Sequence, residues 1–187
     1  MELGTGKGRF IAGMSEAHPD ANFVGFEVQI GVIYYAAQKI FEAERDNAKV
    51  SLFDIAGIEE IVAPGEVDRF YINFCDPWPK AKHAKRRLTY HTFLDRYARL
   101  LKDNGEVHFK TDNEGLFMFS LEEFTNSGWT LKNVSYDKAF CHYVHLQCCT
   151  RIAPNVRQCS GSKLSVCGAY PARRTVDGRY MVHRPGL

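Results

Sequence analysis

FYINFCDPWPKAKHAKRR, residues 70–87, joins an apolar strand to an acid, two prolines around a tryptophan, and a run of cations. Proline has a fixed φ and no backbone N–H, so the strand is expected to end here. The prolines also favour an extended backbone at the residues that precede them, Asp76 and Trp78. We therefore expect Asp76 and Trp78 at the carboxyl end of a strand, the edge where open α/β sheets bind ligands.

The cationic run follows this turn directly. It holds five lysines and arginines between Lys80 and Arg87, with His83 among them. Most charge runs are solvated faces of a helix or loop. This one adjoins the predicted ligand edge in an otherwise acidic part of the chain, which favours contact with a phosphate backbone. The candidate contacts are Lys80, His83, Lys85, Arg86 and Arg87.

Around this stretch, short apolar strands alternate with helical patterns along most of the chain. We expect strands near 1–3, 22–28, 50–53, 67–74, 106–111 and 129–136, and helices near 10–17, 30–45, 89–101 and 116–124. This alternation is typical of an α/β fold with a doubly wound, mostly parallel sheet. Beyond about residue 138 no helix or strand is predicted.

The composition divides the chain at the same place. Residues 1–137 carry 16 lysines and arginines against 21 acids, whereas residues 138–187 carry 8 against 1. Cys75 stands alone in the first part, while the other five cysteines lie in the second. We therefore predict a domain over residues 1–137 and a divergent, basic, poorly ordered tail over 138–187. The tail is interpreted as a shifted reading frame or fusion scar, with a diverged RNA-binding tail as the alternative.

Glycines and strand-end acids mark a candidate ligand site. Gly4 and Gly6 lie in a Gly-rich turn between a strand and a helix, where backbone N–H groups face a ligand, although a plain tight turn explains them equally well. Four acids end consecutive strands, and this coincidence favours a nucleoside site over solvated strand ends. The acids are Glu2, Glu27, Asp54 and Asp76. Glu27 is placed to accept both hydroxyls of a ribose, and Asp54 to contact an adenine.

The acids also indicate which nucleoside cofactor is bound. Four carboxylates would repel a diphosphate, which disfavours a nicotinamide dinucleotide. S-adenosylmethionine carries a sulfonium and an ammonium group and no phosphate, so it is the better electrostatic match. Methyl transfer is therefore preferred, and a NAD-dependent oxidoreductase is the alternative.

Other features allow more than one interpretation. Asp112, at the end of the fifth strand, either contacts a base or caps the following helix. Trp78 either flanks an acceptor purine or fills a gap in the core. The late cysteines and histidines lack zinc-site spacing, so no metal is predicted. There is no signal peptide and no long uncharged apolar run, so we expect a cytoplasmic protein without membrane contact.

Several motifs resemble those of the bacterial tRNA (guanine-N7-)-methyltransferases of the TrmB type. They span residues 2–8, 74–80, 85–89 and 108–113, and the resemblance extends to about residue 137. It implies a Rossmann-like, class I S-adenosylmethionine-dependent fold that methylates the variable-loop guanine (position 46) of tRNA. It also implies cofactor contacts from Glu2, Glu27, Asp54 and Asp76, and substrate contacts from Lys80 and Asp112. Residues 85–87 fall in its RNA-facing segment, and a monomer or homodimer is expected.

The chain departs from this family at both ends. Family members carry a leader before the first strand and finish on a substrate segment and a last strand, so the fold is expected to be incomplete at both ends. These departures predict weak or absent methylation, with a fragment that only binds cofactor or RNA as the alternative function. Guanine N7 needs alignment with the methyl carbon more than a strong base, so the predicted catalytic residue, Asp76, is assigned to orientation.

Overall fold

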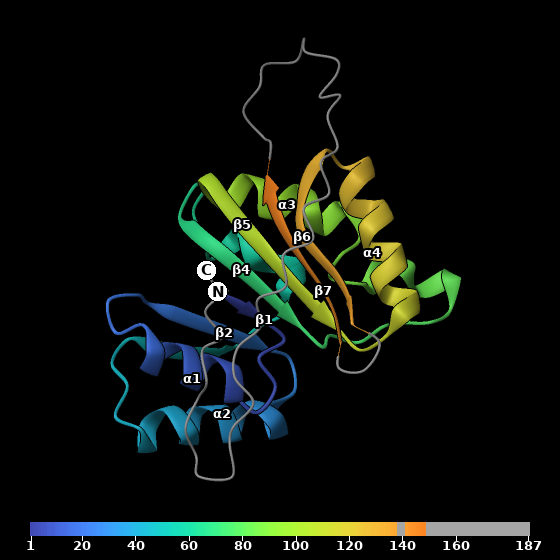
Figure 1. Cartoon of the computed structure of the whole chain (residues 1–187). Helices are drawn as coiled ribbons and strands as arrows, with labels where there is room; N and C mark the ends of the chain where they lie inside the picture. The colour runs from blue at the N-terminus through green and yellow to red at the C-terminus, as the bar shows by residue number, and fades with distance from the viewer. Residues whose placement is uncertain (138–140, 149–187) are drawn as a thin grey trace, which may run out of the picture.

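The computed structural model describes residues 1–137 and 141–148 of the 187-residue chain. Within these residues, seven strands form one sheet in the order β3-β2-β1-β4-β5-β7-β6. The strands are β1 (Glu2–Leu3), β2 (Phe23–Glu27), β3 (Ala48–Leu52), β4 (Val67–Asn73), β5 (Leu101–Thr111), β6 (Trp129–Asp137) and β7 (Cys141–Cys148). The first five are parallel, and β7 runs antiparallel to both β5 and β6. The predicted doubly wound, mostly parallel α/β fold is confirmed (Figure 1).

Helices cover both faces of the sheet. In the described part of the chain they are α1 (Arg9–Ala17), α2 (Ile30–Glu42), α3 (His91–Leu100) and α4 (Glu114–Asn126), with two 3₁₀ segments, η1 (Ile55–Glu60) and η2 (Ala81–Arg86). Neighbouring residues of a strand point to opposite faces. Phe70 of β4 packs on Tyr97 of α3, and the next residue, Tyr71, packs on Phe10 of α1. Helices α1 and α3 therefore lie on opposite sides of the sheet.

The main core fills the space between the sheet and α3 and α4. Phe70 and Ile72 of β4 and Val107 and Phe109 of β5 are completely buried there. The fully buried Phe117 of α4 stacks near Phe109, with ring centroids 6.3 Å apart. From Gly105 to Thr111, fully buried and partly buried residues alternate along β5, and this places Val107 and Phe109 in the core. The core holds the carboxyl ends of β4 and β5 in fixed positions.

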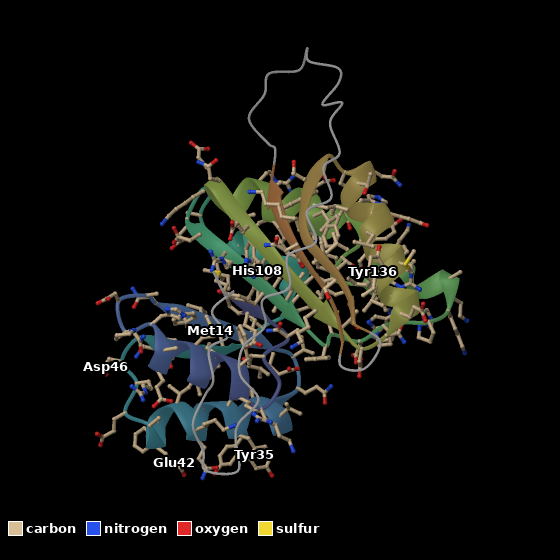
Figure 2. The ribbon with its side chains drawn as sticks, viewed as in Figure 1. Met14, Tyr35, Glu42, Asp46, His108 and Tyr136 are labelled. Atoms are coloured by element: carbon tan, nitrogen blue, oxygen red, sulfur yellow. The ribbon has the colours of Figure 1, made fainter. Side chains whose placement is uncertain are left out.

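On the other side, α2 presents its outer surface to solvent. Tyr35 and Glu42 project from α2 away from the sheet (Figure 2), and Tyr35 is 52% exposed. Residues 33, 36 and 40 form the buried stripe of the helix. Across the described ranges, no helix is both long and apolar enough to cross a bilayer.

Two expectations about the strands need correction. No strand was predicted beyond residue 138, yet β7 pairs with β5 from Glu106↔Gln147 to Thr111↔His142. The sheet therefore continues past the predicted boundary at residue 137, because hydrogen bonds to two neighbouring strands hold β7, whose own apolar and polar alternation is short. Strand β5 also begins at Leu101, earlier than predicted, and includes Asn104 at a φ of 64°. The predicted tail otherwise lies outside the described residues.

Candidate active site

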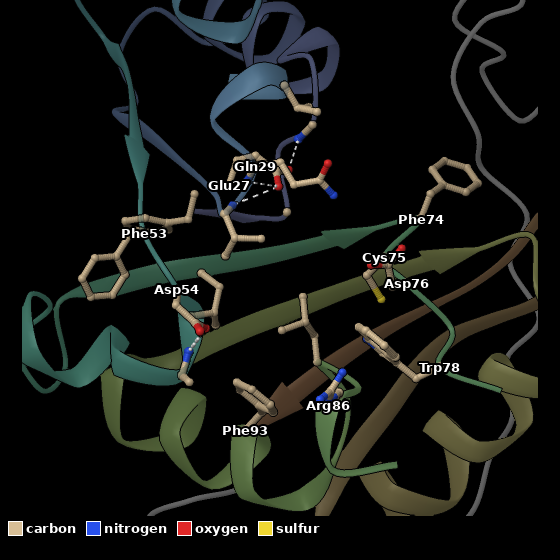
Figure 3. A pocket seen from close by; sticks show the side chains of 18 of the residues that line it. Glu27, Gln29, Phe53, Asp54, Phe74, Cys75, Asp76, Trp78, Arg86 and Phe93 are labelled. Atoms are coloured by element: carbon tan, nitrogen blue, oxygen red, sulfur yellow. Dashed lines mark hydrogen bonds between the residues drawn. The ribbon is translucent and has the colours of Figure 1, made fainter. Parts of the chain in front are cut away.

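A cavity of about 700 Å³ opens at the carboxyl ends of the first four strands (Figure 3). The strand order changes direction between β1 and β4, which is the position where α/β sheets bind ligands. The volume is within the usual range of small-molecule sites. The cavity is lined by Gly4, Gly6, Phe26, Glu27, Val28, Gln29, Val32, Phe53, Asp54, Ile55, Ala56, Phe74, Cys75, Asp76, Trp78, Lys85, Arg86, Leu88 and Phe93.

The glycine turn forms one wall of this cavity. Gly4 and Gly6 line it with φ values of 76° and 56°, a backbone region that other residues rarely adopt. Gly8, at the start of α1, is glycine for a second reason. A Cβ there would lie 2.7 Å from the Cβ of Ala36, so Gly8 allows α1 and α2 to pack closely. The turn is thereby fixed beneath the site.

Glu27, which ends β2, lies against the glycine turn at the edge of the cavity. Its Oε2 accepts a hydrogen bond from the backbone N–H of Gly6 at 3.0 Å. Its Oε1 accepts from the N–H groups of Val28 at 2.9 Å and Gln29 at 3.1 Å. A carboxylate offers about four acceptor positions, so these bonds fix the group and leave capacity for a hydroxyl donor. Glu27 is thus a preorganised acceptor at the cavity edge.

Asp54 lies across the cavity from the proline loop, after β3. Its Oδ1 accepts a hydrogen bond from the N–H of Ala56 at 2.9 Å and caps η1. The remaining carboxylate oxygen is available to a ligand. Phe53 and Ile55 flank Asp54 and add apolar surface to the cavity. An acid between two apolar side chains suits a flat base that carries an amino group.

Glu2 is not part of the cavity lining, although it was predicted to contact the cofactor. It is 4% exposed and lies below the glycine turn. Its carboxylate accepts from the Thr5 hydroxyl at 2.6 Å and from the Asn73 side-chain amide at 3.1 Å. Burial raises the pKa of Glu2 above its usual range. Its observed contacts join the glycine turn to the end of β4, and a cofactor contact remains only a prediction.

The loop after β4 carries Asp76 and Trp78 into the cavity wall. The predicted extended backbone at Trp78 is wrong, because its φ is 42°. Phe74 also has a positive φ, 52°, while its N–H donates to the Lys110 carbonyl at 2.8 Å. Each such conformation costs about 1–3 kcal/mol and persists only where other contacts hold it. Two strained residues therefore flank the exposed carboxylate of Asp76.

Cys75 also lines the cavity, but its chemistry is restricted. Burial, with a further contribution from the charge of Asp76, raises the pKa of Cys75 to about 12. The thiol therefore stays protonated at neutral pH, and only the thiolate is an effective nucleophile. A covalent intermediate on Cys75 is disfavoured, so any group transfer here is expected to be direct.

The predicted RNA-binding cations divide into two sets. Lys85 and Arg86 line the cavity, and Lys80 is exposed near it at the start of η2. The Arg86 guanidinium lies 4.9 Å from the centre of the Trp78 indole, and His83 meets the same ring edge-on at 5.8 Å. These residues place positive charge beside the Asp76 loop.

Arg87 behaves differently. Its Nε donates to the carbonyl of Pro77 at 3.1 Å and to that of Trp78 at 3.3 Å, while a terminal nitrogen donates to Trp78 at 3.0 Å. The guanidinium also lies 4.1 Å from the centre of the Phe119 ring in α4. The structure therefore gives Arg87 an internal role, and RNA contact by this residue remains only a prediction.

Asp112 is exposed at the end of β5 and does not line the cavity. It does not cap α4, because the capping acceptor is Asn113, whose side chain accepts from the N–H of Leu116 at 2.8 Å. Asp112 was expected either to cap this helix or to contact a base, and contact with a base remains a prediction.

Sequence reasoning missed most of the apolar lining. Val32 lies in α2, Phe93 in α3, and Phe53 just after β3, and none stands in a motif. The only available signal was the position of Phe53 directly before a strand-end acid. These side chains supply the flat, apolar surface that a nucleobase needs.

The same fold occurs in several solved methyltransferases. A SAM dependent methyltransferase from Aquifex aeolicus superposes with a TM-score of 0.61 at 16% identity, over 78% of this chain and 79% of that one. A methyltransferase from Pyrococcus furiosus gives 0.60 at 21% identity, over 79% and 73%. The chain thus has the Rossmann-like fold of class I S-adenosylmethionine-dependent methyltransferases.

The sequence comparisons identify the family. Residues 1–142 match the family described as "Putative methyltransferase". A tRNA (guanine-N(7)-)-methyltransferase from Streptococcus agalactiae is 50% identical over 137 residues, which are 73% of this chain and 65% of that protein. One from Streptococcus pyogenes is 47% identical over 143 residues, 76% of this chain and 68% of that protein. The chain belongs to the tRNA (guanine-N7-)-methyltransferase family.

Proposed function

We propose that this chain transfers a methyl group from S-adenosylmethionine to N7 of the variable-loop guanine, position 46, of tRNA. One observation carries the proposal: the family match covers residues 1–142, and every residue that lines the cavity falls within them. The curated relative from Streptococcus agalactiae, at 50% identity, is a tRNA (guanine-N(7)-)-methyltransferase.

The cavity suits the proposed cofactor. Glu27 accepts a ribose hydroxyl, because its carboxylate is held by three backbone N–H groups and retains one acceptor position. Asp54 contacts the adenine amino group, while Phe53 and Phe93 cover the faces of the ring. Three lining carboxylates attract a ligand with a sulfonium and an ammonium group. Family membership favours methyl transfer over the alternative hydride transfer from a nicotinamide.

The reaction needs alignment more than proton transfer. When bound, S-adenosylmethionine supplies a methyl group whose bond to sulfur breaks, with its electron pair passing to sulfur, as the N7 lone pair forms the new bond. Guanine N7 carries no proton, so no base has to remove one. Asp76 orients the acceptor and offsets the positive charge that develops on the purine. Alignment of this kind contributes about 7–11 kcal/mol to a two-substrate step.

The partner is tRNA, bound beside the Asp76 loop. Lys80, His83, Lys85 and Arg86 lie on or next to the rim of the cavity and contact phosphates. Affinity should therefore fall as salt rises, by a slope that counts the phosphates neutralised. We place this activity in the cytoplasm, and we predict a monomer or homodimer.

The proposal is tested with the full chain, labelled S-adenosylmethionine and a tRNA transcript. After nuclease digestion, 7-methylguanosine should appear, and replacing guanine 46 with adenine should abolish it. Cofactor binding without 7-methylguanosine would instead support the alternative of an impaired fragment. Absence of both cofactor binding and product would refute the proposal.

A further inference from the structure

Arg87 occupies an unusual place within the cationic run. Lys80, Lys82 and Lys85 are exposed, whereas Arg87 is partly buried and points under the proline loop. A guanidinium has five N–H donors. Three hydrogen bonds join it to the carbonyls of Pro77 and Trp78 at 3.0 to 3.3 Å. These donors are directed at the protein.

The guanidinium also connects this loop to a rigid part of the fold. It lies 4.1 Å from the centre of the Phe119 ring, and this ring is stacked on Tyr90 with an interplanar angle of 5°. Phe119 belongs to α4, which packs against β5 and β6. Arg87 therefore bridges the main core and the backbone of the loop that carries Asp76.

The loop requires such a support. Trp78 has a φ of 42° immediately before a proline, a conformation that its own sequence disfavours. The two carbonyls on which Arg87 acts are those of Trp78 and of the residue before it. Holding these carbonyls fixes the backbone within two residues of Asp76.

We propose that Arg87 is a positioning residue that holds the Asp76–Trp78 loop in its strained conformation, and that it does not act as a tRNA contact. Lysine cannot replace it, because an ammonium group has neither the planar fork nor the face that stacks on an aromatic ring. The part of this inference that concerns turnover rests on the proposed function, whereas the part that concerns the loop does not.

The test compares Arg87→Lys and Arg87→Met with Lys85→Met, a neighbouring exposed lysine that lines the cavity. Acrylamide quenching of tryptophan emission reports Trp78, because the other tryptophan, Trp129, is 6% exposed. Both Arg87 variants should increase quenching, and Lys85→Met should not. Quenching like that of the wild type in Arg87→Lys would overturn the proposal, whether or not the chain methylates tRNA.

Turnover and salt dependence provide the second arm. At saturating tRNA, both Arg87 variants should lose about 100-fold in kcat, the scale of a small misplacement of reacting groups. The salt slope of tRNA binding should stay at its wild-type value in both, whereas Lys85→Met should reduce it by about 1. A phosphate contact would give the opposite pattern, with the slope reduced in Arg87→Met and kcat kept in Arg87→Lys. If the wild type itself makes no 7-methylguanosine, the proposed function fails while quenching still decides the role of Arg87.

Discussion

Replacing Glu27 with glutamine should weaken cofactor binding while the protein stays folded. The carboxylate now accepts three backbone hydrogen bonds, one from Gly6 through one oxygen and two from Val28 and Gln29 through the other. A glutamine keeps one acceptor oxygen and presents a donor in place of the second. At least one of the three backbone N–H groups must therefore lose its acceptor.

The magnitudes follow from this count. Because Glu27 is only partly buried, water can replace a lost partner, and we expect about 1 kcal/mol of lost stability. Hydrogen bonds to a charged group exceed neutral ones by about 1–1.5 kcal/mol each. One ribose hydroxyl at the remaining acceptor position then accounts for about 1–1.5 kcal/mol, or roughly a 5- to 13-fold rise in Kd.

Calorimetric titration with S-adenosylmethionine measures this loss directly. Glu42→Gln, at an exposed position of α2, is the matched control and should bind like the wild type. A melting curve for each variant separates weaker binding from unfolding. A Kd for Glu27→Gln within twofold of the wild-type value would refute the assignment of the ribose to Glu27.

Three further changes test the site and its support. Asp76→Asn should lower the transfer rate by about 10²–10³-fold, the loss expected when a group that stabilises developing charge is removed. The free energy of unfolding should change by less than about 0.5 kcal/mol, because the side chain is exposed. Single-turnover rates and urea denaturation measure the two effects, and a wild-type rate would remove Asp76 from the mechanism. Gly8→Ala should destabilise the fold by about 1–3 kcal/mol in urea, since the new Cβ would lie 2.8 Å from the Ala36 backbone; an unchanged midpoint would contradict this packing. Burial raises the pKa of Glu2, so the folded protein favours the protonated side chain. Its contribution to the free energy of unfolding is therefore present at low pH and is lost as the pH rises above about 4.3. Glu2→Gln should reduce the loss of stability between pH 4.5 and 7. An equal decline in both proteins would show that Glu2 is not its source.

Local patterns in the sequence were sufficient for the parallel part of the fold. Strand β4 and the loop that follows it combine an apolar run with two prolines, so both the strand and its end were predictable. Glu27 and Asp54 stand at or just after strand ends, and parallel strands bring their carboxyl ends to one edge. Their meeting at one cavity therefore follows from topology alone.

The remaining features depend on contacts between distant parts of the chain. Strand β7 is held by β5 and β6, and its own alternation, from Val144 to Cys148, is too short to predict the strand alone. Proline favours an extended backbone at Trp78, but Trp78 is left-handed because Arg87 binds the Trp78 carbonyl. Arg87 in turn packs on Phe119, which lies 32 positions later in the chain. Glu2 was assigned to the cofactor by its place at a strand end, but the turn above it closes over the carboxylate. Such outcomes require the folded structure.

The most direct test of the central claim uses a tRNA in which 7-deazaguanosine replaces the guanosine at position 46. The substitution removes N7 and keeps the pairing edge and the phosphate backbone. With the full chain and labelled S-adenosylmethionine, we predict methyl transfer to the unmodified tRNA, no transfer to the 7-deaza tRNA, and equal affinity for both. Equal labelling of the two tRNAs would contradict transfer to N7 at this site.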